Sequence, residues 1–421
     1  MRILFISNLY PPHGMGGMEQ RCEETVNLFQ RRGHTCHVLT SRYAVQHREI
    51  PEEGITRALH LQADVDHYRL SDLWLVCSRN RVNRLALQRV LRCFRPDLVF
   101  IWGMWNLSPE VAYWAEKELP GKVAYSIASY WLTEPGIHLD YWQRSARNPR
   151  TERLKSLARP AALAILAQER RSEELGLEHV VCVSKHVRRR LLEANLLPNG
   201  CRVIYNGIDP EPFVNASRSR TASNGNQATL IYVGGILPHK GVQTAIEALG
   251  LLEQRSQGDR LHLELIGGGH PDYVAQLHQR VADLGLSHRV TFHGRKPREE
   301  IPKLLAQAHI FLFTSTWEEP IARSVMEAMA AGLAVIATPV GGQREMLEDG
   351  VNALLYRPDD ADQLAACIQR LRDDRDLCTK LGAAGRRTVL ERFTLDRMAN
   401  EMESWLQSII AGSGAPPEPV H

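Results

Sequence analysis

Short runs of β-branched and aromatic residues alternate with stretches of helical periodicity along almost the whole of this chain. In the first half these runs occupy residues 2–7, 36–41, 97–102, 123–127, 179–184 and 202–206. A second series occupies residues 229–234, 261–267, 289–294, 310–315, 334–338 and 353–357. Alternation of this kind is typical of parallel strands joined by crossover helices. The sequence therefore predicts an α/β protein with two doubly wound parallel sheets, in which ligands bind beyond the carboxyl ends of the strands.

A polar segment separates the two series of strands. Residues 215–228, NASRSRTASNGNQA, contain almost no large apolar side chain and can contribute little to a core. We therefore expect an N-terminal Rossmann-like domain over 1–214, a linker over 215–228 and a second Rossmann-like domain over 229–394. Residues 395–411 are expected to form a last helix, whose apolar face must pack on another surface. The closing residues 412–421 lack the composition to fold, so we expect a loose tail.

Charge and cysteine usage narrow the class of protein. The 421 residues carry a net charge of +3, from 51 basic and 48 acidic side chains, and this balance does not indicate a general nucleic-acid partner. The eight cysteines show no C-x-x-C spacing, which favours reduced thiols and a cytoplasmic location. The opening MRILFISNLYPP is too short an apolar run for a signal peptide, and no stretch approaches the roughly 20 apolar residues of a membrane span.

The first predicted strand is followed by a glycine-rich turn, NLYPPHGMGGMEQ. A dinucleotide fingerprint, G-x-G-x-x-G, needs a third glycine where this chain has Glu19, so the nicotinamide interpretation is weakened. Gly16 and Gly17 still allow a backbone to approach a ligand at the start of a helix. A plain tight turn explains the glycines equally well.

The second half repeats this strand–turn–helix pattern and adds a cation. In YVGGILPHKG, Lys240 lies six residues beyond Gly234 and just before a predicted helix, where it can face a phosphate or remain a solvated surface lysine. The segments LIGGG, containing Gly267, and VTFHGR, containing Gly294 and Arg295, also end strands in glycine. Close approach of a ligand and simple turn chemistry both account for them.

Two glutamates bracket a predicted helix start in EEPIARSVMEAMAAG. Pro320 is well placed as the first helical residue, which leaves Glu319 just outside the helix and Glu327 about two turns within it. The free N–H groups of such a terminus favour an anion, and a carboxylate accepts two hydroxyl hydrogen bonds, as a ribose or sugar diol requires. Glutamates around a helix start are also common on ordinary surfaces.

Taken together, these motifs resemble the retaining GT-B glycosyltransferases of family four. The resemblance runs across nearly the whole chain and includes the segments PPHGMGGMEQ, VCVSKH, VIYNGIDPEPF, YVGGILPHKG, IFLFTSTWEEP and AVIATPVGGQREMLEDG. Its most specific part is E-x7-E, from Glu319 to Glu327, followed by A-M-A-A-G, with N-G-I-D upstream. The resemblance implies a nucleotide-sugar donor held by the C-terminal domain, an acceptor on the N-terminal domain, and a last helix that crosses back to the first domain.

The resemblance also implies roles for individual residues. Lys240 is expected to meet the diphosphate, Glu327 the ribose hydroxyls, and Glu319 the transferred sugar, with Lys240 and Glu319 as the catalytic pair. The remaining donor contacts are expected from glycine turns and from the start of the helix, at Gly16, Gly17, Gly234, Gly235, Gly267, Gly294, Arg295, Ile321, Ala322 and Arg323. Enzymes of this kind typically work without a metal, so we expect no metal and no cofactor. Accordingly, Asp64-Val65-Asp66 is interpreted as a chance D-x-D.

Three positions depart from the family pattern. An arginine is usual where this chain has Gly235, so either another cation, Arg295 or Arg323, replaces it or backbone groups bind the phosphates. Ile321 and Ala322 replace an aromatic–glycine pair, which predicts a tighter donor pocket. Ala128 stands where a histidine commonly reaches the hydroxymethyl group of the donor sugar. Two alternatives follow: the donor is a pentose or deoxysugar, or Tyr130 or His138 substitutes for the histidine.

The acceptor is left open as a glycan, a lipid-linked molecule or a small molecule. A basic stretch over 144–159 carries Arg144, Arg147, Arg150, Arg153, Lys155 and Arg159 against Glu152. This stretch is compatible with a solvated helix face and with peripheral contact to anionic lipid at the inner face of a membrane. Two other functions are weighed beside glycosyl transfer: a catalytically silent nucleotide-sugar-binding subunit and a GT-B nucleotide-sugar epimerase.

Overall fold

The computed structural model describes residues 1–13, 16–44, 53–65, 67–146, 148–167, 174–197, 201–218, 228–255 and 261–412. The chain divides into two compact units. The N-terminal unit comprises Met1–Ile204 and the residues from Ala399 onward, and the C-terminal unit comprises Tyr205–Met398. Each unit is described by itself below.

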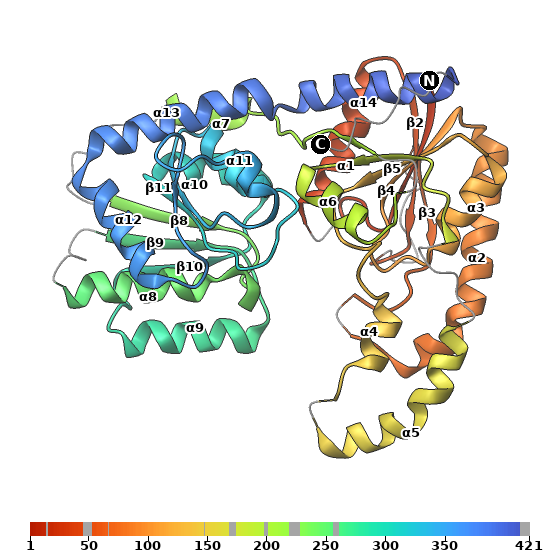
Figure 1. Cartoon of the computed structure of the whole chain (residues 1–421), viewed down its shortest axis with the longest axis horizontal. Helices are drawn as coiled ribbons and strands as arrows, with labels where there is room; N and C mark the ends of the chain where they lie inside the picture. Colours follow the sequence, from red (N-terminus) through yellow and green to blue (C-terminus); the bar gives the residue numbers. More distant parts are fainter. Residues whose placement is uncertain are drawn as a thin grey trace. The chain divides into compact units, whose positions relative to one another are not determined.

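The N-terminal unit is built on a seven-stranded parallel sheet with the order β3-β2-β1-β4-β5-β6-β7 (Figure 1). Its strands are β1 (Arg2–Ser7), β2 (Thr35–Ser41), β3 (Ile55–Leu59), β4 (Leu98–Gly103), β5 (Val123–Ile127), β6 (His179–Cys182) and β7 (Arg202–Val203). In register, Phe5 of β1 pairs with Val38 of β2 and with Phe100 of β4. The central strands β4 and β5 are buried along their whole length, as expected of a sheet covered on both faces.

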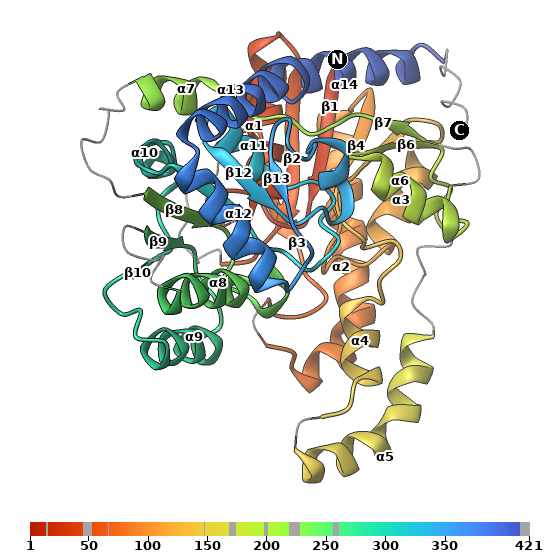
Figure 2. The same cartoon turned by 60° about the vertical axis from the view of Figure 1, so that its left-hand side comes forward.

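Seven helices accompany this sheet among the described residues. They are α1 (Gly17–Arg31), α2 (Leu70–Phe94), α3 (Glu110–Glu118), α4 (Ile137–Gln143), α5 (Pro149–Leu166), α6 (Lys185–Glu193) and α14 (Leu395–Ile410). Both views show α4 and α5 projecting from the rest of the unit, next to the start of α2 (Figures 1 and 2). The buried side chains of Leu73, Trp142 and Leu166 form a small separate core there.

The last helix, α14, belongs to the N-terminal unit from Ala399 onward. Trp405 packs edge-on against Phe100 of β4, with ring centroids 6.1 Å apart. Glu403 forms an ion pair with Arg32 at 2.9 Å and a hydrogen bond with His34 at 2.8 Å, and both partners follow α1. The apolar face recognised in the sequence is thus the face that packs on this sheet.

The C-terminal unit contains a six-stranded parallel sheet with the order β10-β9-β8-β11-β12-β13. Its strands are β8 (Ala228–Val233), β9 (Leu261–Ile266), β10 (Val290–Gly294), β11 (Ile310–Phe313), β12 (Ala334–Ala337) and β13 (Leu354–Leu355). Its helices are α7 (Glu211–Arg218), α8 (Val242–Gln254), α9 (Pro271–Asp283), α10 (Ile301–Gln307), α11 (Arg323–Ala330), α12 (Ala361–Asp373) and α13 (Arg375–Arg392), with short 3-10 turns η2 (Pro238–Lys240), η3 (Arg298–Glu300) and η4 (Gly341–Glu345). Apolar side chains of α8, α9 and α12 join those of β8 and β9 in one core.

The predicted fold, two doubly wound parallel sheets, is confirmed. The structure adds β3, which the sequence analysis did not single out. It also divides the chain at Ile204, earlier than the predicted linker, because α7 packs on α10 and α11 of the C-terminal unit. Of the predicted linker, residues 215–218 end α7, residue 228 begins β8, and 219–227 lie outside the described residues, as does most of the predicted tail.

Among the described residues, no helix is long and apolar enough to cross a membrane.

Candidate active site

Three glycine turns meet at the carboxyl edge of the C-terminal sheet. The amide of Gly234, after β8, donates to Ile266 O at 3.0 Å, and the amide of Gly267, after β9, donates to Gly294 O at 2.9 Å. The turns that end β8, β9 and β10 are therefore joined side by side by backbone hydrogen bonds. Three of the predicted contact residues, Gly234, Gly267 and Gly294, are brought together in this way.

Gly267 is required by the closeness of two of these turns. Its φ is +148°, and a Cβ on it would lie 1.7 Å from Gly234 O. No other residue fits this position without moving the backbone. Gly235, the position where the family usually has an arginine, accepts a hydrogen bond from the buried Tyr232 hydroxyl at 2.8 Å.

The Lys240 ammonium lies directly against the Glu319 carboxylate. Lys240 ends the short turn η2, and Thr314 Oγ1, just after β11, donates to Lys240 O at 2.7 Å. The following Gly241 has a φ of +64° and a Cβ there would lie 2.1 Å from Thr314 O. This close packing of two loops fixes the lysine backbone, and its Nζ bonds to Glu319 Oε1. The side chains are 22% and 12% exposed, so the pair faces solvent only in part.

Glu319 is held from three further directions. Ser315 Oγ donates to Glu319 Oε1 at 3.1 Å, and the Gly342 amide donates to the Glu319 carbonyl at 2.8 Å. The Glu319 amide donates to Trp317 O at 2.8 Å. The sequence analysis missed Ser315, although a polar residue at the end of a predicted buried strand, at the ligand edge, is a signal that could have found it.

The helix that follows Glu319 begins later than predicted. Helix α11 starts at Arg323, whereas the sequence analysis placed its first residue at Pro320. The prediction was wrong because the backbone bonds of Glu319 hold the chain in an irregular path, and Ala322 is still extended with φ −84° and ψ 123°. Glu319 therefore lies four residues before the helix, and Glu327 is its fifth residue, little more than one turn within it.

Glu327 is buried between two arginines. Its side chain is 2% exposed, and Oε1 accepts hydrogen bonds from Arg323 Nε at 2.7 Å and from Arg298 Nη2. Burial by itself would raise the pKa of this carboxyl, but the charges and hydrogen bonds of Arg298 and Arg323 outweigh burial and lower the pKa. The carboxylate is therefore ionised at neutral pH. Arg298 was not among the predicted site residues.

The two arginines proposed to replace the missing one occupy different environments. Arg323 is 10% exposed and committed to Glu327. Arg295 is exposed and lies over Gly268, where an added Cβ would be 2.7 Å from Arg295 Nε. Ile321 and Ala322 are buried, at 6% and 8% exposed.

In the N-terminal unit, Gly16 and Gly17 lie at the start of α1. The Gly16 amide donates to Glu19 Oε2 at 2.9 Å, so the residue that interrupts the dinucleotide fingerprint caps its own helix. Burial raises the pKa of Glu19, although backbone hydrogen bonds from Glu19 and Gly16 act in the opposite direction. Gly14 lies outside the described residues. The predicted role of Gly16 and Gly17 at the phosphates stays a prediction.

The residues around the departure at Ala128 are largely buried. Ala128 follows β5 directly. Tyr130 is 5% exposed and packs edge-on against His186, with ring centroids 6.3 Å apart. His138 is 2% exposed, and its Nδ1 lies 2.9 Å from the Tyr68 hydroxyl. The expectation that Tyr130 or His138 substitutes for the missing histidine stays a prediction.

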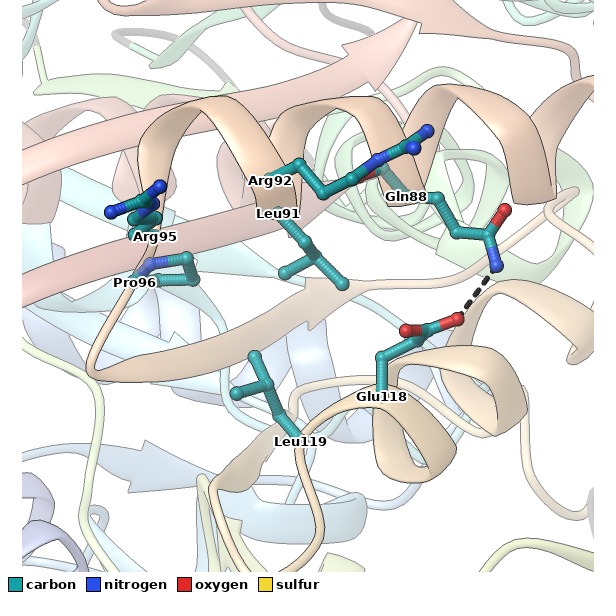
Figure 3. A pocket seen from close by; sticks show the side chains of 7 residues that line it. All are labelled: Gln88, Leu91, Arg92, Arg95, Pro96, Glu118 and Leu119. Carbon is teal, nitrogen blue, oxygen red and sulfur yellow. Dashed lines mark hydrogen bonds between the residues drawn. The ribbon is translucent and has the colours of Figure 1, made fainter.

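A cavity of about 470 Å³ lies elsewhere in the N-terminal unit, between the C-terminal ends of α2 and α3. Figure 3 shows Gln88 of α2 joined to Glu118 of α3 across it, at 2.6 Å. Pro96, on its wall, leads into β4, so the cavity opens at the amino end of that strand. Ligands of doubly wound sheets bind at the opposite edge, and we do not assign this cavity to the active site.

Metal-ligand chemistry has little support in the described ranges. Within them, no group of three or more histidine, cysteine or carboxylate side chains could hold a metal ion. Asp64 of the D-x-D segment is described, whereas Asp66 is not. The expectation that the protein needs no metal stays a prediction.

Two doubly wound parallel sheets, with joined glycine turns at the carboxyl edge of the second, are the architecture expected of a GT-B protein. A sequence profile described as "Glycosyltransferase Family 4" matches residues 15–212, and one described as "Glycosyl transferases group 1" matches residues 214–388. The chain belongs to glycosyltransferase family four, as its motifs predicted.

Curated relatives share this family at modest identity. An uncharacterized glycosyltransferase of Methanocaldococcus jannaschii is 24% identical over 95% of this chain and 96% of its own. The amylovoran biosynthesis glycosyltransferase AmsK of Erwinia amylovora is 36% identical, but over 43% of this chain and 46% of its own. A GDP-mannose-dependent phosphatidylinositol monomannoside mannosyltransferase of Mycobacterium tuberculosis is 28% identical over 55% of this chain and 62% of its own.

Solved structures confirm the fold. The Anabaena protein HepE, in a complex with UDP and glucose, superposes with a TM-score of 0.67 at 21% identity, covering 97% of this chain and 100% of its own. Sucrose-phosphate synthase from Thermosynechococcus elongatus reaches a TM-score of 0.73 at 20% identity, covering 98% of this chain and 100% of its own.

Proposed function

We propose that this glycosyltransferase transfers a sugar from a nucleotide-diphosphate sugar to a glycan, lipid-linked or small-molecule acceptor, with retention of the anomeric configuration. The observation that carries the proposal is the pairing of Lys240 with Glu319 beside the joined glycine turns. Two comparisons support a nucleotide-sugar donor: HepE has been solved with UDP-glucose, and the mycobacterial relative is named as GDP-mannose-dependent.

The chemistry follows from the charge that develops on the leaving group. The bond between the anomeric carbon and the diphosphate oxygen breaks, the acceptor oxygen bonds to that carbon, and the acceptor proton passes to the leaving phosphate. Negative charge therefore grows on the diphosphate, where the fixed Lys240 ammonium and nearby backbone amides can stabilise it. No side chain is assigned as a nucleophile, and no step needs a metal.

Glu319 and Glu327 have distinct roles in this proposal. Glu319 orients Lys240 and accepts hydrogen bonds from the transferred sugar, which its partial exposure permits. Glu327 accepts the ribose hydroxyls. Because its Oε1 already receives two guanidinium hydrogen bonds, the other carboxylate oxygen is the acceptor left for the ribose.

The test is Lys240→Ala, with the exposed Lys303→Ala as the matched control. Loss of a charge-assisted contact of about 1.5 to 3 kcal/mol lowers kcat/KM roughly 10- to 150-fold, whereas the control leaves it unchanged. Both variants should keep the far-ultraviolet circular dichroism of the parent. Near-normal transfer by Lys240→Ala would remove this residue from the site.

Analysis of the reaction products separates glycosyl transfer from the two alternative functions. A silent binding subunit binds the donor tightly and transfers nothing to any acceptor, and an epimerase changes the donor without an acceptor. Mass spectrometry of a donor mixture incubated with cell extract distinguishes these outcomes from transfer. A donor panel also addresses Ala128, since strong preference for glucose or mannose over their 6-deoxy forms would exclude a donor that lacks the 6-hydroxyl.

We also propose that the N-terminal unit touches an anionic membrane surface, on the cytoplasmic side, through α5. Leu154 and Leu157 of α5 are 71% and 81% exposed, next to Arg150 and Arg153, whose exposed side chains have no ion-pair partner among the described residues. The other cations of the basic stretch are less available to contact lipid than the composition indicated. Arg144 pairs with Asp140, Arg159 pairs with Glu152, and Lys155 is buried. Arg147 lies outside the described residues.

Flotation with anionic vesicles tests this surface. Paired Leu154→Asp and Leu157→Asp changes should abolish vesicle binding, while Leu390→Asp, an exposed leucine of the C-terminal unit, should not. Absence of binding by the parent protein at low salt would refute the contact.

A further inference from the structure

A second cavity of the N-terminal unit lies at the ligand edge of its sheet. It encloses about 200 Å³ and is lined by residues that follow β2 and β3 and by the first turns of α2. Arg42 and Tyr43 come directly after β2, His60 comes directly after β3, and Arg69 immediately precedes α2. This is the edge at which doubly wound sheets bind ligands, and no role has been assigned to these residues above.

Three arginines and two aspartates are among the described residues that line this cavity, so their formal charges sum to +1. Arg79 is neutralised by Asp72, at 2.8 Å, and Arg69 lies 3.9 Å from Asp64 in a pair that is largely exposed and therefore weak. Arg42 is exposed, and its guanidinium has no partner in the described part of the chain. Among the described residues, one guanidinium is thus uncompensated and a second is only weakly compensated.

His60 adds a neutral polar group to the cavity. Burial lowers its pKa, and the charges of Arg42 and Arg79 lower it further. The imidazole is therefore uncharged at neutral pH, and it can donate or accept a hydrogen bond. Arg42 and Arg79 line the same cavity as this ring.

Two buried asparagines hold the walls of the cavity in place. The Asn83 side chain, 1% exposed, accepts from the His60 amide at 2.7 Å and donates to the His60 carbonyl at 2.9 Å. In the same way, the Asn106 side chain accepts from the Ala63 amide at 3.0 Å and donates to the Ala63 carbonyl at 2.8 Å. Because the backbone of the wall is fixed before a ligand arrives, little ordering is needed on binding.

We propose that this cavity binds a phosphate group carried by the acceptor, with Arg42 and Arg69 as the ligating cations. Guanidinium groups match phosphate oxygens with paired hydrogen bonds, and a cavity of this size accommodates a phosphate with part of its attached sugar or headgroup. The inference rests on the proposed function, because it names the acceptor class of the same enzyme. The phosphate can belong to a soluble sugar phosphate or to the headgroup of a lipid.

The experiment uses the full chain and two phosphate probes. Glucose 6-phosphate, compared with glucose, is titrated by calorimetry at low ionic strength, and vesicles of phosphatidylcholine with phosphatidic acid are compared with vesicles of phosphatidylcholine alone. The variant is Arg42→Gln, and the matched control is Arg89→Gln, an exposed arginine of α2 that does not line the cavity. Arg42→Gln should weaken binding about tenfold or more, whereas Arg89→Gln should not change it.

Each outcome is decisive. Weakened binding of glucose 6-phosphate indicates a soluble acceptor phosphate, and weakened binding confined to the phosphatidic acid vesicles indicates a lipid-borne one. If neither probe binds the parent protein, or if Arg42→Gln binds as tightly as Arg89→Gln, the inference is overturned. Nucleotide sugars are tested separately for their effect on Tm, so that failure of donor binding counts against the proposed function and not against the cavity.

Discussion

Substitution of Glu327 by glutamine tests whether the site is built around a buried, doubly paired carboxylate. The change keeps the size of the side chain and removes the charge that faces Arg298 and Arg323. Breaking a buried ion pair costs about 3 to 5 kcal/mol, because an uncompensated charge is left behind. Arg298 is 30% exposed and regains water, so the lower end of this range, about 3 kcal/mol, is expected for the free energy of unfolding of the C-terminal unit.

The pH dependence of this loss follows from the pKa of Glu327. The pKa is lowered in the folded protein from an ordinary value of 4.5, so the carboxylate contributes its full stabilisation above pH 4.5. This contribution is lost as the pH falls through the lowered pKa of the folded state. The difference in stability between the parent and Glu327→Gln should therefore be largest at neutral pH and should shrink in acid.

Urea unfolding followed by circular dichroism measures both effects. Glu299→Gln, at an exposed position beside Arg298, controls for the loss of one negative charge from the same region. Equal unfolding midpoints for Glu327→Gln and Glu299→Gln at neutral pH would refute the reasoning. A difference that stays constant into acid would refute the assigned pKa shift.

Two further predictions concern a buried histidine of the N-terminal unit and a glycine turn of the C-terminal unit. Burial lowers the pKa of His138 from 6.5 to about 4, so in this pH range the unfolded chain takes up a proton that the folded chain excludes. The free energy of unfolding should therefore fall between about pH 6.5 and 4, by up to roughly 3 kcal/mol. The variant His138→Asn should remove this fall, measured by the fluorescence of Trp142 during unfolding in denaturant. Gly267→Ala should destabilise the C-terminal unit by at least about 2 kcal/mol, because its Cβ meets Gly234 O, while Gly294→Ala, with φ +66° and open space, should lose only about 1 kcal/mol. Equal unfolding midpoints for the two alanine variants would contradict the close approach of the turns.

Most strands could be predicted because parallel strands are buried on both faces and leave continuous apolar runs in the sequence. Strand β3, ITRAL, is the exception. It lies at the edge of its sheet, and Leu59 is its one buried residue, so Thr56 and Arg57 interrupt any apolar run. Edge strands of this kind carry little periodic signal, and the tertiary pairing with β2 decides their structure.

The candidate site was predictable where local chemistry decides it and unpredictable where distant residues meet. Glycines at strand ends follow from the need for close backbone approach, and Gly234, Gly267 and Gly294 do lie together. Arg298, by contrast, comes from a short turn 29 residues before Glu327 and has no motif of its own. The start of α11 was mispredicted at Pro320 for a related reason, since a hydrogen bond from the distant Gly342 holds Glu319 outside the helix.

The absence of an arginine at Gly235 can be weighed against the cations that the structure places at this edge. Lys240 is shared with Glu319, and Arg323, which bonds through Nε to the buried Glu327 carboxylate, would weaken that pairing by turning to a phosphate. Arg295 carries no such penalty, because it is exposed and has no carboxylate partner among the described residues. The Arg295 side chain lies against Gly268. The Gly268 carbonyl accepts a hydrogen bond at 2.8 Å from the amide of Ile236, which lies in the same turn as Gly235. Of the two replacements considered from the sequence, the charge balance of this edge therefore favours Arg295 over Arg323.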